Sequence, residues 1–228
     1  MSEETSNVEE LPDVVALFPL PNVVLFPHVD LPLHIFEPRY RDMVRDAMAG
    51  DRLIGMVLLR GDWRKDYNGS PAIFRVGCVG RIEQFELLPD GRSNLVLHGL
   101  RSFDVVEELP GRSYRRARVR WRDERPAAAG GAAAGTGSER RLRAVVTRLL
   151  ERGDRPVPGD LWERLPAEIE KLVNVLGFSL DLGEVEKLSL LECAGTELRL
   201  ERLIEIIEFR LAERGMGAAG ARGHEPWH

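Results

Sequence analysis

The stretch LFPLPNVVLFPHVDLPLHIFEPRY, residues 17–40, is apolar almost throughout, yet prolines interrupt it at short intervals. Proline lacks a backbone donor, so it fits strand ends, sheet edges, turns and the first turn of a helix. The prolines therefore predict short extended pieces, among them residues 23–26 and 31–35, separated by bends at Pro19, Pro21, Pro27 and Pro32.

A helix is predicted to begin at Pro38, where the fixed backbone angle of proline favours a first helical residue. One apolar face follows at helical spacing and comprises Tyr40, Met43, Val44 and Ala47. From there to residue 125, apolar runs alternate with tight-turn residues, and Gly77 and Gly80 predict bends inside a long strand. This pattern predicts a small β-barrel with one early helix.

The second part of the chain has a helical pattern. Residues 126–138, PAAAGGAAAGTGS, have the composition of a flexible linker, and apolar stripes at helical spacing follow, including a helix over 166–176 that stops at Gly177. The fold class is therefore predicted to be α+β. The expected domains are a disordered lead (1–12), a barrel (13–125), the linker (126–138), a helical bundle (139–214) and a disordered tail (215–228).

Composition narrows the classes of function. The net charge of −5 gives no overall field that would attract nucleic acid or anionic lipid. The chain has no apolar run of the roughly 18 residues that a membrane span requires, and its acidic beginning differs from a secretory signal. We therefore expect a cytoplasmic protein without a membrane partner. Cys78 and Cys193 stand far apart, which favours small apolar side chains over a disulfide or zinc site.

Three motifs carry a family resemblance: LFPLPNVVLFP (17–27), LPLHIFEPRYRDMV (31–44) and RVGCVGRIEQFELLPDGRSNLVLHGLRSF (75–103). In this order they closely resemble the substrate-binding (N-terminal) domain of Lon proteases, in particular its free-standing bacterial form without ATPase and protease domains. The resemblance covers roughly residues 14–213 and implies a PUA-like barrel followed by a helical bundle. It also implies partners, namely unfolded or tagged polypeptides and a Lon-type protease system.

Within these motifs, Glu37, Arg39 and Tyr40 are the candidate substrate-binding residues. A carboxylate at position 37 would face the unpaired N–H groups of the first helical turn. The EPRY sequence can also pair Glu37 with an arginine and bury the tyrosine ring. Two roles stay open for this group, a structural clamp and a direct contact with a client polypeptide.

Four arginines offer an alternative site. Arg116, Arg118, Arg120 and Arg122 alternate with Ala117, Val119 and Trp121, which predicts a basic strand face. Such a face would suit an RNA- or nucleotide-binding protein. No aromatic residues alternate with the arginines as stacking platforms, so nucleic acid is the weaker alternative. The other interpretation is a solvated face that also protects a sheet edge.

A third alternative is an enzyme with a site in a cleft, for which His28, His34 and Glu37 are the best local cluster. Their spacing matches no established metal site, and the sequence contains neither a GxSxG elbow nor a GxxxxGK[ST] phosphate loop. We therefore predict no catalytic residues, no metal and no cofactor. The predicted function is a non-catalytic polypeptide-binding module that acts as an adaptor or holdase.

Overall fold

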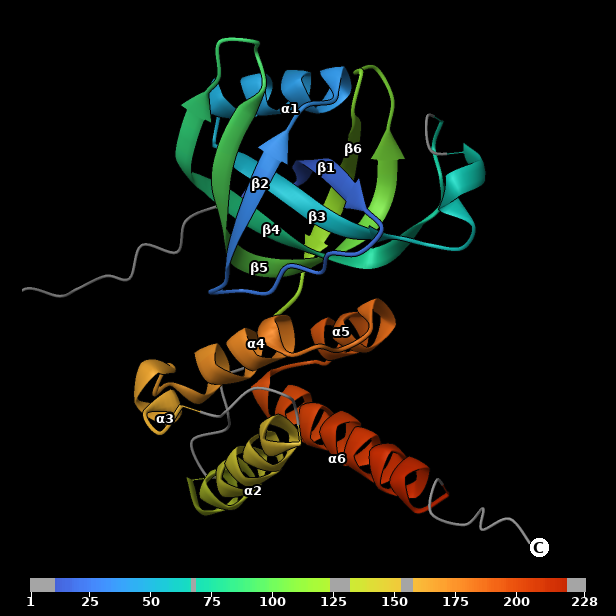
Figure 1. The fold of residues 1–228 in the computed structure, drawn as a ribbon. Helices are drawn as coiled ribbons and strands as arrows, with labels where there is room; N and C mark the ends of the chain where they lie inside the picture. The colour runs from blue at the N-terminus through green and yellow to red at the C-terminus, as the bar shows by residue number, and fades with distance from the viewer. Residues whose placement is uncertain (1–10, 67–68, 124–131, 153–157, 221–228) are drawn as a thin grey trace, which may run out of the picture.

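The computed structural model of the chain describes residues 11–66, 69–123, 132–152 and 158–220. The described strands are β1 (Val14–Leu20), β2 (Asp30–Ile35), β3 (Leu53–Leu59), β4 (Ile73–Leu87), β5 (Ser93–Leu109) and β6 (Arg115–Trp121). The described helices are α1 (Pro38–Met48), the 3-10 helix η1 (Trp63–Asp66), α2 (Ala132–Glu151), α3 (Leu161–Arg164), α4 (Ile169–Ser179), α5 (Glu184–Leu191) and α6 (Thr196–Gly220). Figure 1 shows a barrel above a group of helices.

The strands form one sheet in the order β2-β5-β4-β3-β1-β6, and β6 also pairs with β5, which closes the barrel. β5 makes this closure because it is long: His98 pairs with Asp30 of β2, and Phe103 pairs with Trp121 of β6. β5 therefore continues through Gly99 as one strand. Register shifts near Gly80 bend β4 against β5, as the sequence predicted. The predicted α+β class, a barrel followed by a bundle, is confirmed.

β6 is an interior strand of the closed barrel. Ala117 pairs with Val15 of β1, and Val119 pairs with Val105 of β5, so both edges of β6 carry ladder hydrogen bonds. The prediction that its arginines protect a sheet edge is therefore wrong. One of these edges is covered by β1 from the opposite end of the barrel sequence, and a local residue pattern does not contain such a long-range pairing.

The barrel interior is filled around Phe103, which is fully buried. A Cβ atom on Gly77 would lie 2.7 Å from the Phe103 ring, and one on Gly55 would lie 2.9 Å from it. Both distances are too short for a side chain, so the backbones of β3 and β4 approach the ring only because these positions are glycine. Gly77 therefore serves close packing in addition to the bend.

The proline-rich connection between β1 and β2 is a buried loop. Residues 23–26, predicted to be extended, belong to no strand of the sheet, and Val24, Leu25 and Phe26 are buried. The loop runs along the barrel surface that faces the helices (Figure 1). The ring of Phe26 lies 3.5 Å from the position of a Cβ on Gly177 of α4. Gly177 thus lies inside α4 and allows close contact with the barrel, whereas the sequence predicted that it ends the helix.

The helical bundle differs from the prediction mainly at its ends. α2 begins at Ala132, inside the predicted linker, and α6 continues to Gly220, beyond the predicted end of the bundle at residue 214. Alanine is the residue with the highest helix propensity, so an alanine-rich segment can extend a helix. Leu11, inside the predicted disordered lead, packs against the barrel core, while residues 1–10, 124–131 and 221–228 lie outside the described residues. Among the described helices, none combines the length and apolar character that crossing a bilayer requires.

The bundle packs directly onto the barrel. Buried residues of both parts belong to one continuous apolar cluster, which includes Phe26 and Leu97 of the barrel and Leu190 of α5. Polar contacts between described residues also cross the junction. His28 Nε2 lies 3.4 Å from a Glu170 carboxylate oxygen, and Arg122 donates to the backbone carbonyl of Glu192 at 2.6 Å. Core packing and polar contacts therefore fix the bundle against the barrel.

Candidate functional site

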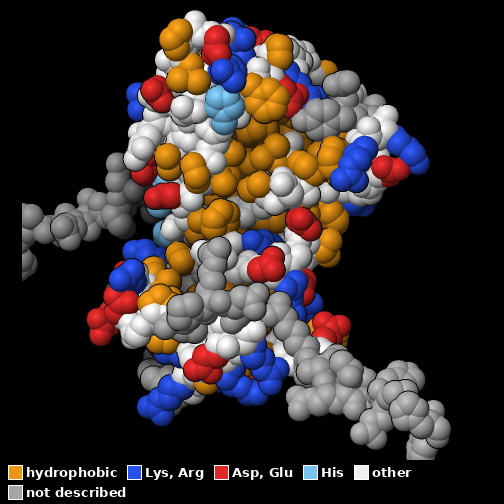
Figure 2. All heavy atoms as spheres, in the orientation of Figure 1, with side chains coloured by type: hydrophobic (Ala, Val, Ile, Leu, Met, Phe, Trp, Pro, Cys, Tyr) orange, Lys and Arg blue, Asp and Glu red, His pale blue; other side chains and the backbone are white. Residues whose placement is uncertain are grey.

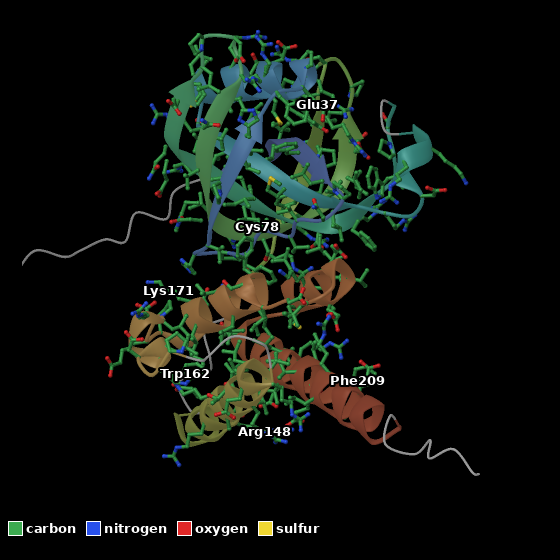
Figure 3. The ribbon with its side chains drawn as sticks, viewed as in Figure 1. Glu37, Cys78, Arg148, Trp162, Lys171 and Phe209 are labelled. Carbon is green, nitrogen blue, oxygen red and sulfur yellow. The ribbon has the colours of Figure 1, made fainter. Side chains whose placement is uncertain are left out.

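Glu37 is the N-cap residue of α1, but its carboxylate makes no capping hydrogen bond. The carboxylate instead accepts from Arg39, with Oε2 at 3.0 Å from Nε and 2.9 Å from Nη2. The prediction that it faces the first-turn N–H groups is therefore wrong, whereas the predicted arginine pair is present. The pair fixes the corner where the chain passes from β2 into α1, and Figure 3 places Glu37 at this end of the barrel.

Tyr40 is buried, and its ring centroid lies 4.3 Å from that of Phe18. The guanidinium of Arg39 stacks over the same tyrosine ring at 4.7 Å. Arg39 therefore makes an ion pair with Glu37 and a cation–π contact with Tyr40, and these contacts restrain both side chains. The geometry is that of the predicted clamp, and a contact of these residues with a client polypeptide stays a prediction.

A pocket of about 380 Å³, called the helix pocket below, opens beside this clamp and is lined by Arg39, Tyr40, Tyr114 and Arg115, among others. Its arginines are paired. Arg115 forms an ion pair with Glu108 at 2.6 Å, and Arg112 forms one with Asp46 at 3.1 Å. The pocket is therefore polar but largely neutral.

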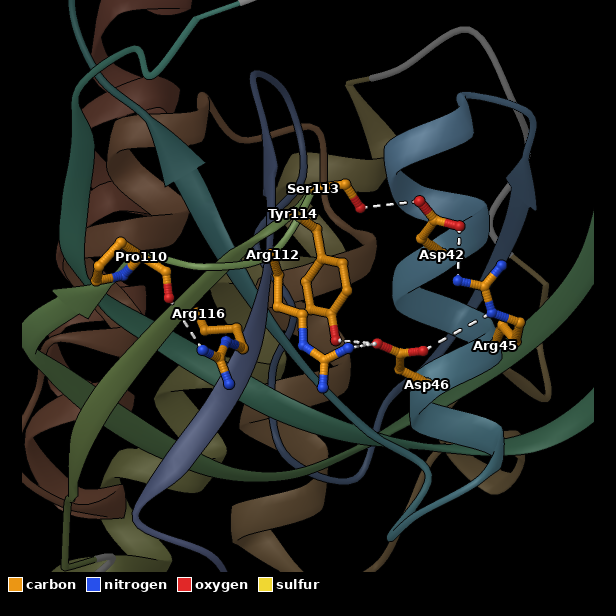
Figure 4. Close-up of polar contacts among 8 residues, drawn as sticks. All are labelled: Asp42, Arg45, Asp46, Pro110, Arg112, Ser113, Tyr114 and Arg116. Carbon is orange, nitrogen blue, oxygen red and sulfur yellow. Dashed lines mark hydrogen bonds and ion pairs between the residues drawn. The ribbon is translucent and has the colours of Figure 1, made fainter.

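The turn between β5 and β6 is tied to α1 at the wall of the helix pocket (Figure 4). Tyr114 donates to Asp46 at 2.8 Å, and Ser113 donates to Asp42 at 2.9 Å. The hydrogen bond from Ser113 lowers the pKa of Asp42. Burial, followed by the hydrogen bond to Asp46, raises the pKa of Tyr114, so its hydroxyl stays protonated as a donor. We call these four residues the α1 clamp.

A second hollow lies where β2, β4 and β5 meet near the β4–β5 turn, and we call it the tip groove. It measures about 530 Å³ and is lined by Pro32, Leu33, His34, Gln84, Phe85, Glu86, Asn94, Leu95 and Val96. Large apolar side chains at and near it are exposed to solvent: Phe36 by 59%, Phe85 by 39% and Leu87 by 67%. The ring of Phe36 stacks with that of His34 at 6.2 Å between centroids, which places Phe36 beside the groove.

The polar side chains of the tip groove are hydrogen-bonded to one another. His34 Nδ1 lies 2.7 Å from the side-chain oxygen of Asn94, and Asn94 donates to Glu86 at 3.0 Å. These hydrogen bonds fix the polar side chains, while Phe36, Phe85 and Leu87 stay exposed to solvent. Figure 2 shows that hydrophobic side chains also gather in a hollow on the front of the barrel. Contiguous exposed apolar surface of this kind marks interaction sites.

The tip groove was not predicted from the sequence. The local pattern gave no signal, because residues 84–87 within the run 83–87 alternate polar and apolar residues as a half-buried strand does. All five of its side chains are exposed. An apolar residue in such a run has no core to face.

The arginines of this face lie against neighbouring groups of the barrel. Arg120 and Arg122 both form ion pairs with Asp104, at 3.2 Å and 2.9 Å. Arg116 donates to the carbonyl of Pro110, and Arg118 lies opposite Glu107 in the strand register. A nucleic-acid surface needs positive charge that is free to meet phosphate. These contacts remove the main support for that alternative.

The candidate catalytic cluster does not come together. His28 contacts Glu170, His34 contacts Asn94, and Glu37 contacts Arg39. Each side chain thus has a separate partner on a different part of the barrel or bundle, so the three residues lack the convergence that a metal or an acid–base site requires.

A different group could hold a cation. Asp30, Glu83 and His98 come from three adjacent strands, and their ligand atoms all lie within 4.8 Å of one another. Two carboxylates and an imidazole suit a divalent transition metal. However, His98 Nδ1 already contacts Asp30 at 2.6 Å, and both carboxylates are exposed to solvent. The sequence predicted no metal site because the three positions are brought together only by strand pairing.

Comparison with known proteins gives a consistent result. The family model for the ATP-dependent protease La (LON) substrate-binding domain matches residues 14–208. Lon protease 2 of Myxococcus xanthus is 26% identical over 211 residues, which are 88% of this chain and 24% of that protein. The Lon protease of Cytophaga hutchinsonii is 32% identical over 117 residues, which are 51% of this chain and 14% of that protein. The chain thus spans about a quarter or less of these relatives.

Solved structures agree with the sequence comparison. A Lon N-terminal domain protein from Xanthomonas campestris is 26% identical, with a TM-score of 0.57 over 84% of this chain and 97% of its own. The N-terminal domain of the Mycobacterium avium complex Lon protease has a TM-score of 0.63 over 86% of this chain and 98% of its own. Its identity of 18% supports the shared fold alone. With a family model that matches most of its length, the chain belongs to the LON substrate-binding domain family.

Proposed function

We propose that this chain is a non-catalytic module that binds unfolded or tagged polypeptide segments, as an adaptor or holdase. The observation that carries the proposal is the exposure of Phe36, Phe85 and Leu87 at and beside the tip groove. Extended, unfolded chains expose the apolar side chains that folded proteins bury, and such side chains can fill an apolar groove. Family membership supports the same class of ligand.

The tip groove suits an extended segment in a second way. β2 is the last strand in the sheet order and pairs only with β5 among the described strands. A polypeptide that adds to a strand edge gains main-chain hydrogen bonds, while neighbouring pockets select its side chains. Pro32 lies in β2 and lacks an N–H, so this edge offers fewer donors than a regular strand would. Affinity would therefore come mainly from apolar contacts.

In this proposal, the predicted site residues Glu37, Arg39 and Tyr40 support the groove. They fix the corner that directly follows Phe36, so they would hold the Phe36 ring in position for a client segment. Removal of Arg39 should therefore weaken client binding less than removal of Phe36. A direct contact of Arg39 with the client would reverse that order.

The proposed partner beyond the client is a Lon-type protease system, which the names of the relatives suggest. The sequence contains no phosphate-binding loop of the GxxxxGK[ST] type, so we propose that binding and release by this chain need no ATP. The separation of His28, His34 and Glu37 supports a module without catalytic chemistry.

The test compares two states of one client. A permanently unfolded protein, reduced and carboxymethylated, and its native form would each be labelled and titrated with this chain while fluorescence anisotropy is measured. We expect saturable binding of the unfolded form alone. Equal binding of both forms, or binding of neither, would contradict the proposal. A parallel titration with single-stranded RNA tests the arginine face, whose involvement predicts affinity that falls steeply with salt.

A further inference from the structure

The outer side of α6 carries two large apolar side chains in contact with solvent. Leu198 is 59% exposed and Phe209 is 62% exposed. Two exposed charged residues, Arg202 and Glu205, lie between them on the same side of the helix. The four positions follow one another at steps of four, three and four residues, which is the spacing of a coiled-coil seam. We call these four residues the α6 stripe.

The neighbouring helices leave this stripe uncovered. On one flank, Glu208 of α6 forms an ion pair with Arg141 of α2 at 2.7 Å. On the other flank, Arg210 pairs with Glu186 of α5. The opposite side of α6 is buried in the bundle core through residues such as Leu203. The charges on both flanks are thus engaged within the chain, whereas the apolar ends of the stripe face solvent. Figure 3 shows Phe209 on α6, far from Glu37 at the other end of the molecule.

The order of residues in the stripe is self-complementary when it is reversed. Along the helix it is apolar, basic, acidic, apolar, and the two pairs share one midpoint between Leu203 and Ile204. If a second copy of α6 lies antiparallel across the first, Leu198 faces Phe209 of the second copy. Arg202 then faces Glu205 of the second copy. Two-fold symmetry repeats each contact, as an isologous interface requires.

We propose that the chain associates with a second copy of itself through an antiparallel pairing of the α6 stripes. The proposal rests on the charge complementarity of the stripe with its own reversed copy. Within one chain, Arg202 and Glu205 form an exposed pair at 3.2 Å. Such a surface pair contributes little stability. The two pairs within the chains can therefore be exchanged for two pairs between the chains at little cost. Burial of Leu198 and Phe209 adds the driving force.

The dimer has a consequence for polypeptide binding. The β4–β5 turn, which carries the tip groove, lies at the far end of the barrel from α6 (Figure 1). A dimer through α6 therefore leaves both grooves uncovered and joins them in one particle. A long unfolded chain could then occupy both grooves, which raises its apparent affinity without any new type of contact. Self-association does not depend on the proposed function, because it is measured without a client.

The test uses exchanged charges, read by sedimentation velocity over a concentration series. Arg202→Glu places glutamate against Glu205 of its copy, and Glu205→Arg places arginine against Arg202 of its copy. Because symmetry repeats the repulsion, we expect each variant to associate about tenfold or more weakly than the unsubstituted chain. An equimolar mixture of the two variants should associate again, since every contact between unlike chains is then of opposite charge.

The controls separate this surface from general effects. Phe209→Asp should abolish association, whereas Val185→Asp, which changes an exposed apolar residue of α5 outside the stripe, should leave it unchanged. A monomeric unsubstituted chain at every concentration, or a mixture of the charge variants that stays monomeric, would overturn the proposal. So would Phe209→Asp if it left association intact and weakened binding of the unfolded client instead.

Discussion

The arginine face of β6 and the tip groove differ in how far their side chains are engaged by the rest of the protein, and residue composition does not reveal this difference. The arginine face carries the most conspicuous charge pattern in the sequence, yet two of its four arginines form ion pairs with Asp104. The tip groove shows no comparable charge pattern, yet it exposes Phe85 to solvent and has Leu87 beside it. Binding capacity therefore depends on what the fold leaves without a partner, and a count of residue types does not measure this.

The largest expected effect concerns the tip groove. The double substitution Phe85→Asp with Leu87→Asp should weaken binding of an unfolded client about a hundredfold, because apolar anchors that become buried on binding dominate such interfaces. Both side chains are exposed in the free protein, so the fold should be retained. Fluorescence anisotropy measures the affinity, and circular dichroism checks the fold.

The matched control is the pair Arg118→Ala with Arg120→Ala, which removes two charges from the arginine face. Client binding should stay within about twofold of the unsubstituted chain, since exposed charges contribute little to such contacts. The opposite pattern, with loss of binding in the arginine variant and none in the tip variant, would reverse our assignment of the two surfaces.

The next effect tests whether the arginine face is structural. Arg122 donates to Asp104 at 2.9 Å and to the Glu192 carbonyl at the end of α5 at 2.6 Å, and thus joins barrel to bundle. Arg122→Ala should lower the free energy of unfolding by about 2 kcal/mol, the typical value for hydrogen bonds to charged groups. Urea denaturation provides the measurement. Arg118→Ala, on the same face, should change stability by less than about 0.5 kcal/mol. Equal effects of the two would contradict a specific role for Arg122.

The sequence predicted the parts of the fold that depend on local rules. Pro38 does begin α1, and the barrel-then-bundle order is correct. Gly177 was misassigned because glycine can end a helix or admit a close neighbour, and only the position of Phe26 distinguishes these roles. The pairing of β6 with β1 was not predicted either, because it joins positions far apart in the sequence, such as Val15 and Ala117.

For the candidate site too, the sequence predicted only contacts between neighbouring positions. The pair between Glu37 and Arg39 and the burial of Tyr40 follow from neighbouring positions, and both are present. The tip groove needs three strands in register, so it could not be assembled from sequence spacing alone. The partners of the arginine face were missed for the same reason, since Asp104 lies on a different strand.

A smaller effect is expected from the α1 clamp, where hydrogen bonds and an ion pair hold the carboxylates of α1. Tyr114→Phe removes the hydrogen bond to Asp46 and should cost about 1 kcal/mol of unfolding free energy. Asp46 keeps its ion pair with Arg112, so its charge is not left alone. Arg112→Ala removes the more exposed partner and should cost less. Thermal unfolding of both variants gives the comparison, and a larger loss for Arg112→Ala would show that the tyrosine hydroxyl is not the main support.

The smallest effect is a pH dependence at Asp42. Its pKa is lowered chiefly by the hydrogen bond from Ser113, so the folded state is stabilised while the carboxylate is charged. That contribution is present above the unfolded pKa of about 3.9 and is lost as pH falls through the lower folded value. Ser113→Ala should therefore be slightly less stable than the unsubstituted chain at neutral pH, and the two urea midpoints should converge in acid. In an Asp42→Asn background the Ser113→Ala difference should no longer vary with pH, because the titrating partner is gone. If the stability difference kept the same pH dependence in that background, another titrating group would be its cause. Ser113 would then not stabilise the charged form of Asp42.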